Sequence, residues 1–361
     1  MRAAILEEYG KPLVVDDVDL APPGPGEVRV RIAATGVCHS DLSIQNGSLP
    51  WPVPAVLGHE GAGEITEVGE GVRSVEVGDH VVISWIPMCG RCFFCARGQQ
   101  YLCSTYRMAL GRMDDGKTRL SRAGVELSHA INAATFAEET VVREQSVVRI
   151  PEDVPLDIAA LMGCGVLTGI GAALNTAQIR AGERVAVIGA GGVGLNVIQG
   201  AKVAGASVIL AIDPMESKRE AAKKFGATHV CAPEDAEEMS KELTGGIRPD
   251  AVFEVVGRPA LQRQAFDLVR PGGRAVLVGA APVTEEVSFP TLGFLFFERQ
   301  VLGCYYGSVN PQRDVPRIID LWRARKIYLQ DLITDTAPLD KVNEAFAALE
   351  SGEAIRTVLV P

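Results

Sequence analysis

The second half of the chain alternates apolar segments with amphipathic ones, and this alternation restricts the fold more than any other feature. From Arg184 onward the apolar runs read VAVIG, VILAID, THVCA, AVFEVV, RAVLVG and QVLGCYY, with helix-like stretches such as MESKREAAKKFGA between some of them. Strands that are apolar on both faces belong to parallel sheets covered by helices on each side. The sequence therefore predicts an α/β, doubly wound Rossmann domain on a six-stranded parallel sheet.

The rest of the chain has a different texture. Residues 1–165 read as short strands broken by Gly and Pro, and residues 306–361 contain two helix-like stretches and a last strand, RTVLV. A chain of 361 residues is expected to form two domains. We predict a β-rich domain over 1–165, the Rossmann domain over 166–305, and a return of 306–361 to the first domain, because this tail is too short to fold alone.

A glycine-rich motif follows the first apolar run of the Rossmann half. It comprises Gly189, Gly191, Gly192, Val193 and Gly194, with a strand before it and a helical stretch after it. Such glycines let the pyrophosphate of a dinucleotide approach the amino terminus of the helix. Asp213, nineteen residues past Gly194, would bind the adenosine ribose and repel a 2′-phosphate, so the motif favours NAD over NADP. Lys218 would reach the same ribose or remain a solvated helix lysine.

Four of the eight cysteines fall in one segment, residues 88–104. They are Cys89, Cys92, Cys95 and Cys103. Short Cys-x-x-Cys spacings let one loop present several thiolates to a tetrahedral zinc, and four sulfurs leave no open position, which describes a structural ion. A disulfide pair and an iron–sulfur cluster are the alternatives, although the seven-residue gap before Cys103 fits common ferredoxin spacings poorly.

Three further candidate ligands are scattered along the chain. Cys38 stands in GVCHSD, His59 in LGHEG and Cys164 in LMGCG. Catalytic zinc sites use three protein ligands and keep one open position, and two cysteines with one histidine form a known set. Taken singly, each cysteine is equally explained as a small buried apolar residue, and the histidine as a hydrogen-bonded core residue.

Charge and hydropathy limit the partners of the protein. The net charge is −10, with acidic and basic residues interspersed, so no basic stripe is offered to nucleic acid or to an anionic membrane. The amino-terminal segment MRAAILEEYG has no apolar signal region, and no apolar run reaches membrane-spanning length. We expect a cytoplasmic protein with a small-molecule substrate.

Taken together, these motifs resemble the zinc-dependent medium-chain alcohol dehydrogenases over essentially the whole chain. GVCHSDL, LGHEGAGEITEVGEGV, the four-cysteine segment, LMGCGVLTG, GAGGVG and GEAIRTVLV occur in the order of that family. The resemblance implies a GroES-like catalytic domain and two zinc ions, one on Cys38, His59 and Cys164 and a structural one on the four clustered cysteines. It also implies NAD-linked, reversible oxidation of a primary alcohol, and a homodimer formed through the edge strand near residues 301–306.

The resemblance assigns roles beside the catalytic zinc. Ser40 would be the first proton acceptor, Asp41 would orient the histidine ligand, and Glu60 would lie beside the metal. In many members the proton relay ends on a histidine three residues after the serine, where this chain has Ser43. Because serine does not take up a proton near neutral pH, the proton would leave through water or through His39.

The resemblance also implies cofactor and substrate contacts. His39 and Arg356 would bind the pyrophosphate, and Thr168 would pack near the nicotinamide. The substrate pocket would be lined by Leu49, Trp85, Met108, Phe136 and Tyr305. Because most of these side chains are large and apolar, the pocket favours apolar or aromatic primary alcohols.

Two other functions remain open. A branch of the same family oxidises S-hydroxymethyl adducts of thiols such as glutathione; the loop GRMDDGKTRL resembles that branch, and Arg107 falls near its anion-binding arginine. Leu49, however, stands where that branch has an acidic residue. A non-enzymatic, zinc-lobed binding module, for instance for nucleic acid, agrees poorly with the acidic charge and the intact glycine motif.

Overall fold

The computed structural model describes residues 1–106 and 109–361, which form two compact units. The first unit comprises Met1–Gly165, Asn310–Asp320 and Leu329–Pro361, and the second comprises Val166–Val309 and Leu321–Tyr328. The carboxy-terminal return thus begins at Asn310 and is interrupted by a short segment of the second unit. No helix in the described part of the chain combines the length and the apolar character needed to cross a bilayer.

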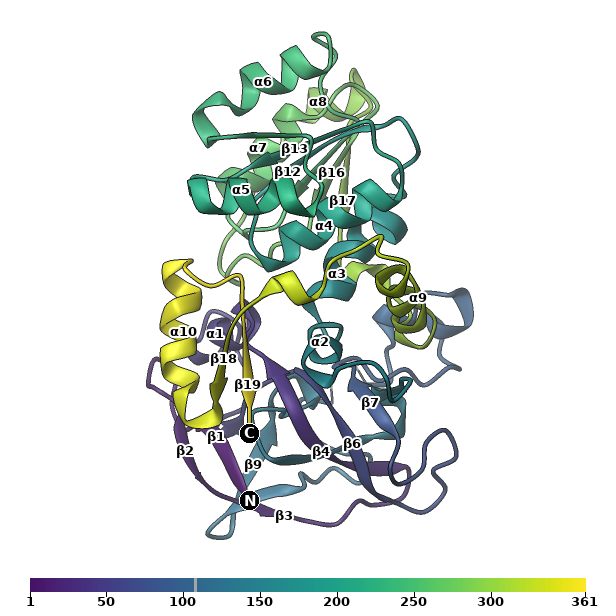
Figure 1. The fold of residues 1–361 in the computed structure, drawn as a ribbon, viewed down its shortest axis with the longest axis vertical. Coiled ribbons are helices and arrows are strands. Elements are labelled where there is room, and N and C mark those ends of the chain that lie inside the picture. Colours follow the sequence, from purple (N-terminus) through teal and green to yellow (C-terminus); the bar gives the residue numbers. More distant parts are fainter. Residues whose placement is uncertain (107–108) are drawn as a thin grey trace. The chain divides into compact units, whose positions relative to one another are not determined.

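The second unit is built on a parallel sheet of six strands in the order β14-β13-β12-β15-β16-β17, which confirms the predicted doubly wound fold. Figure 1 labels β12, β13, β16 and β17 of this sheet. The strands are β12 (Arg184–Ile188), β13 (Val208–Ile212), β14 (His229–Cys231), β15 (Ala251–Glu254), β16 (Arg274–Leu277) and β17 (Gln300–Gly303). The strand order reverses between β12 and β15, which pair in parallel register. Open α/β sheets bind ligands at the carboxyl ends of the strands at such a reversal.

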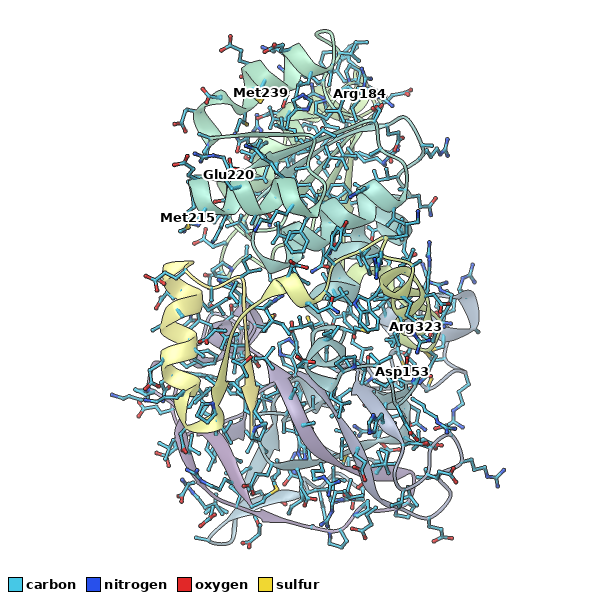
Figure 2. The ribbon with its side chains drawn as sticks, in the orientation of Figure 1. Asp153, Arg184, Met215, Glu220, Met239 and Arg323 are labelled. Carbon is cyan, nitrogen blue, oxygen red and sulfur yellow. The ribbon has the colours of Figure 1, made fainter. Side chains whose placement is uncertain are left out.

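The helices of this unit differ in how much of their surface is buried. They are α3 (Gly165–Gly171), α4 (Gly192–Val203), α5 (Glu216–Phe225), α6 (Ala236–Leu243), α7 (Pro259–Leu268) and α8 (Thr291–Leu295), and a π-helical turn, Ala172–Thr176, extends α3. On α5, Ala222 and Phe225 are buried, whereas Glu220, labelled in Figure 2, is exposed. Gly226 ends α5 in a left-handed conformation with a φ of 117°, which favours glycine.

The first unit consists mainly of two sheets. One has the order β2-β1-β5-β9-β8-β3, and the other the order β11-β7-β6-β4-β19-β18, with β10 paired to β4. The strands are β1 (Arg2–Leu6), β2 (Val14–Asp17), β3 (Asp19–Leu20), β4 (Glu27–Gly36), β5 (Ala55–Val56), β6 (Glu60–Val68), β7 (His80–Ile83), β8 (Leu120–Arg122), β9 (Val125–His129), β10 (Glu139–Arg143), β11 (Val147–Arg149), β18 (Ile333–Pro338) and β19 (Arg356–Val360).

Four further helices are α1 (His39–Gln45), α2 (Leu156–Leu161), α9 (Pro311–Arg323) and α10 (Val342–Ser351). The carboxy-terminal strand β19 pairs antiparallel with β4, through Val358 with Gly36 and Leu359 with Thr35. This pairing brings the start of β19 close to the end of β4, where the first candidate metal ligand lies.

Candidate active site

Four side chains that can ligate a metal converge in the first unit. Their ligand atoms all lie within 4.8 Å of one another and all four residues are buried: Cys38, His59, Glu60 and Cys164. Cys38 is the N-cap of α1, His59 directly precedes β6, Glu60 begins β6, and Cys164 follows α2. The fold therefore brings the three predicted zinc ligands together, from three separate segments, and places the predicted Glu60 beside them.

The donor atoms of this buried cluster fit a zinc ion. Two thiols and an imidazole form a catalytic zinc set. The Nε2 atom of His59 is buried and has no hydrogen-bond partner among the described residues, as expected of a nitrogen that faces a metal. A hydrogen bond with Cys164 holds the pKa of the Cys38 thiol well below its ordinary value, which favours the thiolate that ligates.

Asp41 fixes the orientation of the histidine ligand. Its buried Oδ1 lies 3.0 Å from Nδ1 of His59 and accepts a hydrogen bond from the backbone N–H of Gly58 at 3.0 Å. When Nδ1–H donates to this carboxylate, the lone pair of Nε2 remains for the metal. Burial raises the pKa of Asp41, although the facing His59 opposes this shift.

Glu60 and Arg356 form a buried pair at the edge of the cluster. Arg356 Nη2 lies 3.6 Å from Oε1 of Glu60, which also accepts a hydrogen bond from the Gly165 N–H at 3.1 Å. Burial raises the pKa of Glu60 to about 8. A Cβ on Gly36 would lie 2.4 Å from Glu60 Oε2, so a larger residue at this point of β4 would displace the carboxylate.

Arg356 was predicted to contact the cofactor pyrophosphate. In the structure it is 4% exposed and donates a hydrogen bond to the Val37 carbonyl at 3.2 Å. A Cβ on Gly165 would lie 2.1 Å from Nη2 of Arg356, so the guanidinium fills the space that this glycine leaves. The guanidinium is thus part of the surroundings of the metal cluster.

Helix α1 carries the residues predicted for proton transfer. Ser40 Oγ lies 3.9 Å from Cys38 Sγ, and Ser43 stands one turn further along the same helix. His39 is exposed on the first turn. The helix thus places Ser40 beside Cys38, a candidate zinc ligand, and Ser43 further along the helix.

The predicted pocket residues fall into different environments. Trp85 meets the ring of His59 edge-on, with 6.3 Å between the ring centroids. Leu49 and Trp85 are half-buried against one apolar core of the first unit. Phe136 is fully buried in this core, and its ring is tilted against that of Phe346. Tyr305 belongs to the second unit and is 38% exposed. Met108, like Arg107, lies outside the described residues.

The four clustered cysteines form a second candidate metal centre. Their sulfurs also lie within 4.8 Å of one another, with 4.0 Å between Cys89 and Cys95 and 3.9 Å between Cys92 and Cys103. These separations are far longer than a disulfide bond, and they agree with the edge of about 3.8 Å of a tetrahedron with Zn–S bonds of about 2.3 Å. The cysteine-rich lobe (residues 88–104) therefore fits a closed structural zinc site.

The glycine motif forms the turn between β12 and α4. Gly189 has a φ of 99°, and a Cβ on Gly194 would lie 2.0 Å from the Gly189 carbonyl oxygen. Gly191, the N-cap of α4, faces open space, so a pyrophosphate has room at the helix amino terminus. Gly192 and Val193 begin the helix.

Asp213 follows β13 beside this turn. Its Oδ2 accepts a hydrogen bond from the Ala190 N–H at 2.8 Å, and its Oδ1 accepts one from the Met215 N–H at 2.9 Å. The carboxylate therefore also holds the glycine turn, a contact that the spacing alone did not predict. Lys218 is half-buried on α5, and Thr168 lies on α3.

Known proteins share this arrangement of sites. The alcohol dehydrogenase GroES-like domain matches residues 24–152, and the zinc-binding dehydrogenase domain matches residues 192–324. A putative alcohol dehydrogenase D from Mycobacterium tuberculosis is 41% identical over 363 residues, which cover 99% of both chains. The chain belongs to the zinc-dependent medium-chain alcohol dehydrogenase family. The predicted family is thereby confirmed.

Two further relatives of this dehydrogenase carry more specific names. An S-(hydroxymethyl)glutathione dehydrogenase from Synechocystis is 41% identical over 368 residues and covers 99% of both chains. The crystal structure of benzyl alcohol dehydrogenase from Acinetobacter calcoaceticus has a TM-score of 0.93 and 32% identity, with 99% of this chain and 98% of that chain covered. The family identifies the protein as an oxidoreductase that uses zinc and a nicotinamide dinucleotide.

Sequence reasoning missed several residues that build the sites of this dehydrogenase. It did not foresee the pairing of Arg356 with Glu60, nor the Arg219 side chain that donates to the Asp213 carbonyl at 2.8 Å. It also passed over Glu254, a fully buried carboxylate at the end of β15. An acid inside an apolar strand, as in AVFEVV, was the available signal.

Proposed function

We propose that this dehydrogenase oxidises apolar or aromatic primary alcohols to aldehydes, reversibly, with NAD. The observation that carries the proposal is Trp85, whose ring lies edge-on to the His59 ligand. A large apolar ring beside the metal cluster offers no acceptor to the extra hydroxyls of a polyol and narrows the space for bulky secondary alcohols. The likeness to benzyl alcohol dehydrogenase supports the same substrate class.

The residues of the first unit have distinct parts in this reaction. Cys38, His59 and Cys164 would hold a zinc ion, whose Lewis acidity would lower the pKa of the alcohol substrate. Asp41 holds the His59 ring in the tautomer that ligates. Ser40, next to the ligand cysteine, accepts the alcohol proton at Oγ while it passes its own hydroxyl proton on to water or to His39.

The second unit supplies the specificity for NAD. A 2′-phosphate would meet the carboxylate of Asp213, which lies at the glycine turn. We assign Lys218 to the same ribose, Thr168 to the nicotinamide and His39 to the pyrophosphate, as the family resemblance implies. The implied contact of Arg356 with the pyrophosphate would have to be made by a guanidinium that is 4% exposed and already pairs with Glu60.

A substrate panel with a matched pair of variants tests the alcohol class. Benzyl alcohol and hexan-1-ol should give kcat/KM values at least about tenfold above those of glycerol and cyclohexanol, with NAD preferred over NADP. Trp85→Ala should lower the preference for benzyl alcohol and admit cyclohexanol. Trp51→Ala is the control, since Trp51 packs on the same apolar core and donates to Ser128 Oγ at 3.1 Å. Equal selectivity changes in both variants would refute the assignment.

Oxidation of an S-hydroxymethyl thiol is the second candidate. The Synechocystis relative named for this activity supports it. Leu49 offers no charge to the thiol adduct, which favours the first proposal. NADH formation from formaldehyde that strictly requires glutathione would select the second candidate.

We also propose that the protein is a homodimer. Leu292, Leu295 and Phe296 on and beside α8 are 61%, 73% and 72% exposed, and β17 is an edge strand of the sheet. An apolar patch beside an open strand edge suits a self-complementary interface. Phe296→Asp should shift the mass in sedimentation from dimer to monomer, whereas Phe93→Asp, at a 64% exposed ring in the cysteine-rich lobe, should not.

A further inference from the structure

The last residue of strand β15 is Glu254, a carboxylate to which the proposed reaction assigns no role. Glu254 has no exposed surface and pairs with Ile188, the last residue of β12. It therefore lies where the strand order reverses, at the carboxyl ends of the strands. Dinucleotides bind across the sheet at this reversal.

The carboxylate of Glu254 organises the loop that follows it. Its Oε1 accepts hydrogen bonds from the backbone N–H groups of Val256 at 2.9 Å and Gly257 at 2.7 Å. Its Oε2 is buried and has no hydrogen-bond partner within the described part of the chain. Burial raises the pKa of this group, and the backbone donors oppose the shift. Burial of an acid is costly unless its oxygens accept hydrogen bonds, and here the backbone of the loop supplies them.

That loop packs on the glycine turn. A Cβ on Gly189 would lie 2.7 Å from Cγ2 of Val256 and 3.0 Å from Cγ2 of Val255, and one on Gly194 would lie 3.2 Å from the latter atom. Gly257, with a φ of 84°, passes so close to the next strand end that a Cβ would meet the Ala280 carbonyl oxygen at 2.4 Å. The position of the loop therefore limits the position of the turn.

We propose that Glu254 is a positioning residue for the dinucleotide: its carboxylate fixes residues 255–257, and this loop in turn holds the glycine motif in the shape that receives the pyrophosphate. Val256, 45% exposed beside Gly189, gives the loop an exposed apolar side chain next to the glycine turn. The proposal rests on the use of NAD proposed above.

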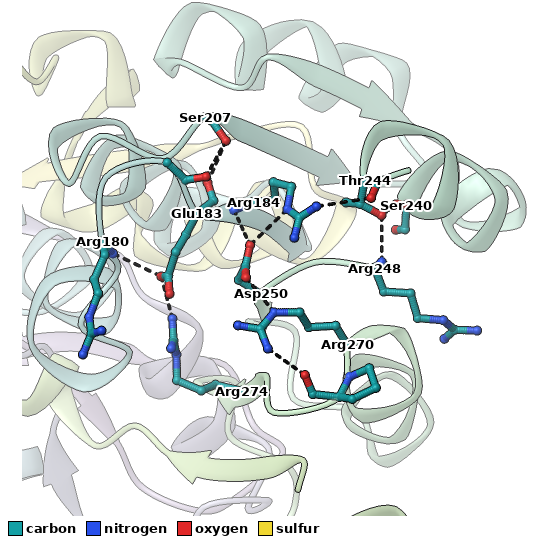
Figure 3. A network of polar contacts seen from close by, with 12 residues as sticks. Arg180, Glu183, Arg184, Ser207, Ser240, Thr244, Arg248, Asp250, Arg270 and Arg274 are labelled. Carbon is teal, nitrogen blue, oxygen red and sulfur yellow. Dashed lines mark hydrogen bonds and ion pairs between the residues drawn. The ribbon is translucent and has the colours of Figure 1, made fainter. Parts of the chain in front are cut away.

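The opposite end of β15 offers a matched control. Asp250, just before the strand, is 7% exposed. Its Oδ2 accepts from the Arg184 N–H at 2.8 Å and its Oδ1 from Arg270 Nε at 2.6 Å (Figure 3). It thus joins neighbouring segments as Glu254 does, but at the amino ends of the strands, away from the glycine turn.

The test compares Glu254→Ala, Glu254→Gln and Asp250→Asn with the wild-type protein. The readouts are the Kd of NADH by fluorescence, the KM of NAD, kcat and the melting temperature. Glu254→Ala should raise the Kd and KM about tenfold without lowering kcat, since the chemistry is untouched. Glu254→Gln should raise them about threefold, because its amide oxygen still accepts the two N–H groups. Asp250→Asn should lower the melting temperature and leave the Kd unchanged.

Each outcome decides the matter. An unchanged Kd in Glu254→Gln overturns the proposal even when Glu254→Ala does not fold. The proposal is also overturned if the Kd of Asp250→Asn rises, and if in all the variants the rise in Kd is proportional to the loss of melting temperature. Glu254 would then have only a structural role. Failure of the wild-type protein to bind NADH would refute the proposed function instead.

Discussion

The two candidate zinc centres of the first unit use similar ligands but are built in different ways. The cysteine-rich lobe takes all four ligands from residues 89–103, and backbone N–H groups support the sulfurs, as at Cys92, which donates to Cys89 at 3.3 Å. The buried cluster takes its ligands from three segments, and side chains support it: Asp41 on His59 and Arg356 on Glu60.

We expect the two centres to use their metal differently, one to shape a loop and the other in the reaction. A loop with few apolar contacts depends on its ion for its shape. The buried cluster lies within a core formed by paired strands and packed helices, so we expect its geometry to persist without the ion. Removal of the two ions should therefore have different consequences.

Loss of a ligand in the buried cluster should give the largest effect. Cys164→Ala should reduce the zinc content from two ions to one and lower kcat/KM about 10³-fold or more, because several kcal/mol of Lewis-acid stabilisation disappear. The melting temperature should fall by only a few degrees. Zinc analysis, steady-state kinetics and calorimetry on one preparation check this. A variant that unfolds would break the proposed distinction between the two centres.

Loss of a ligand in the lobe should act mainly on stability. Cys95→Ala should also release one zinc, lower the melting temperature clearly and disturb assembly, since the lobe loses its closed site. The fraction that stays folded should keep most of its kcat. A stable, fully folded Cys95→Ala protein that lacks only catalysis would contradict this assignment.

Loss of the carboxylate that orients the histidine ligand should have an intermediate effect. Asp41→Asn keeps an oxygen that can face Nδ1 of His59 but removes the charge, so zinc affinity at the buried site should fall about tenfold to a hundredfold. Competition with a chromophoric chelator measures both sites in one titration. The affinity of the lobe should not change, and a parallel loss at both sites would show a general defect of folding.

The smallest effect concerns the proton path beside the buried cluster. Because Ser43 does not hold a proton, turnover should fall more steeply at low pH than in relatives with a histidine there. Ser43→His should flatten the acid limb of the kcat profile between about pH 5.5 and 7 without changing the melting temperature. An unchanged pH profile would refute the role of this position.

Much of this architecture followed from local sequence. The six-stranded sheet was predicted because each buried strand is apolar along its length, and the turn at Gly189 because its glycines stand between a strand and a helix. The lobe was predicted because its cysteines lie within one short segment.

Other features could not be read from the sequence. Arg356 reaches Glu60 only because β19 pairs with β4, and the pairing of distant strands is not encoded in local spacing. The contact of Asp213 with the glycine turn and the position of Glu254 at the strand reversal likewise depend on which strands become neighbours.

The sequence by itself thus determined the kinds of ligand, the glycine turn and the two fold types. Each of these depends on residues a few positions apart, whose geometry the local backbone fixes. The family resemblance implied that Cys38, His59 and Cys164 share one site, with Glu60 and Asp41 beside it. Only the tertiary structure brings these side chains together in one buried cluster. Bringing such distant residues together requires the free energy of packing an entire core, and no short segment of the chain contains that information.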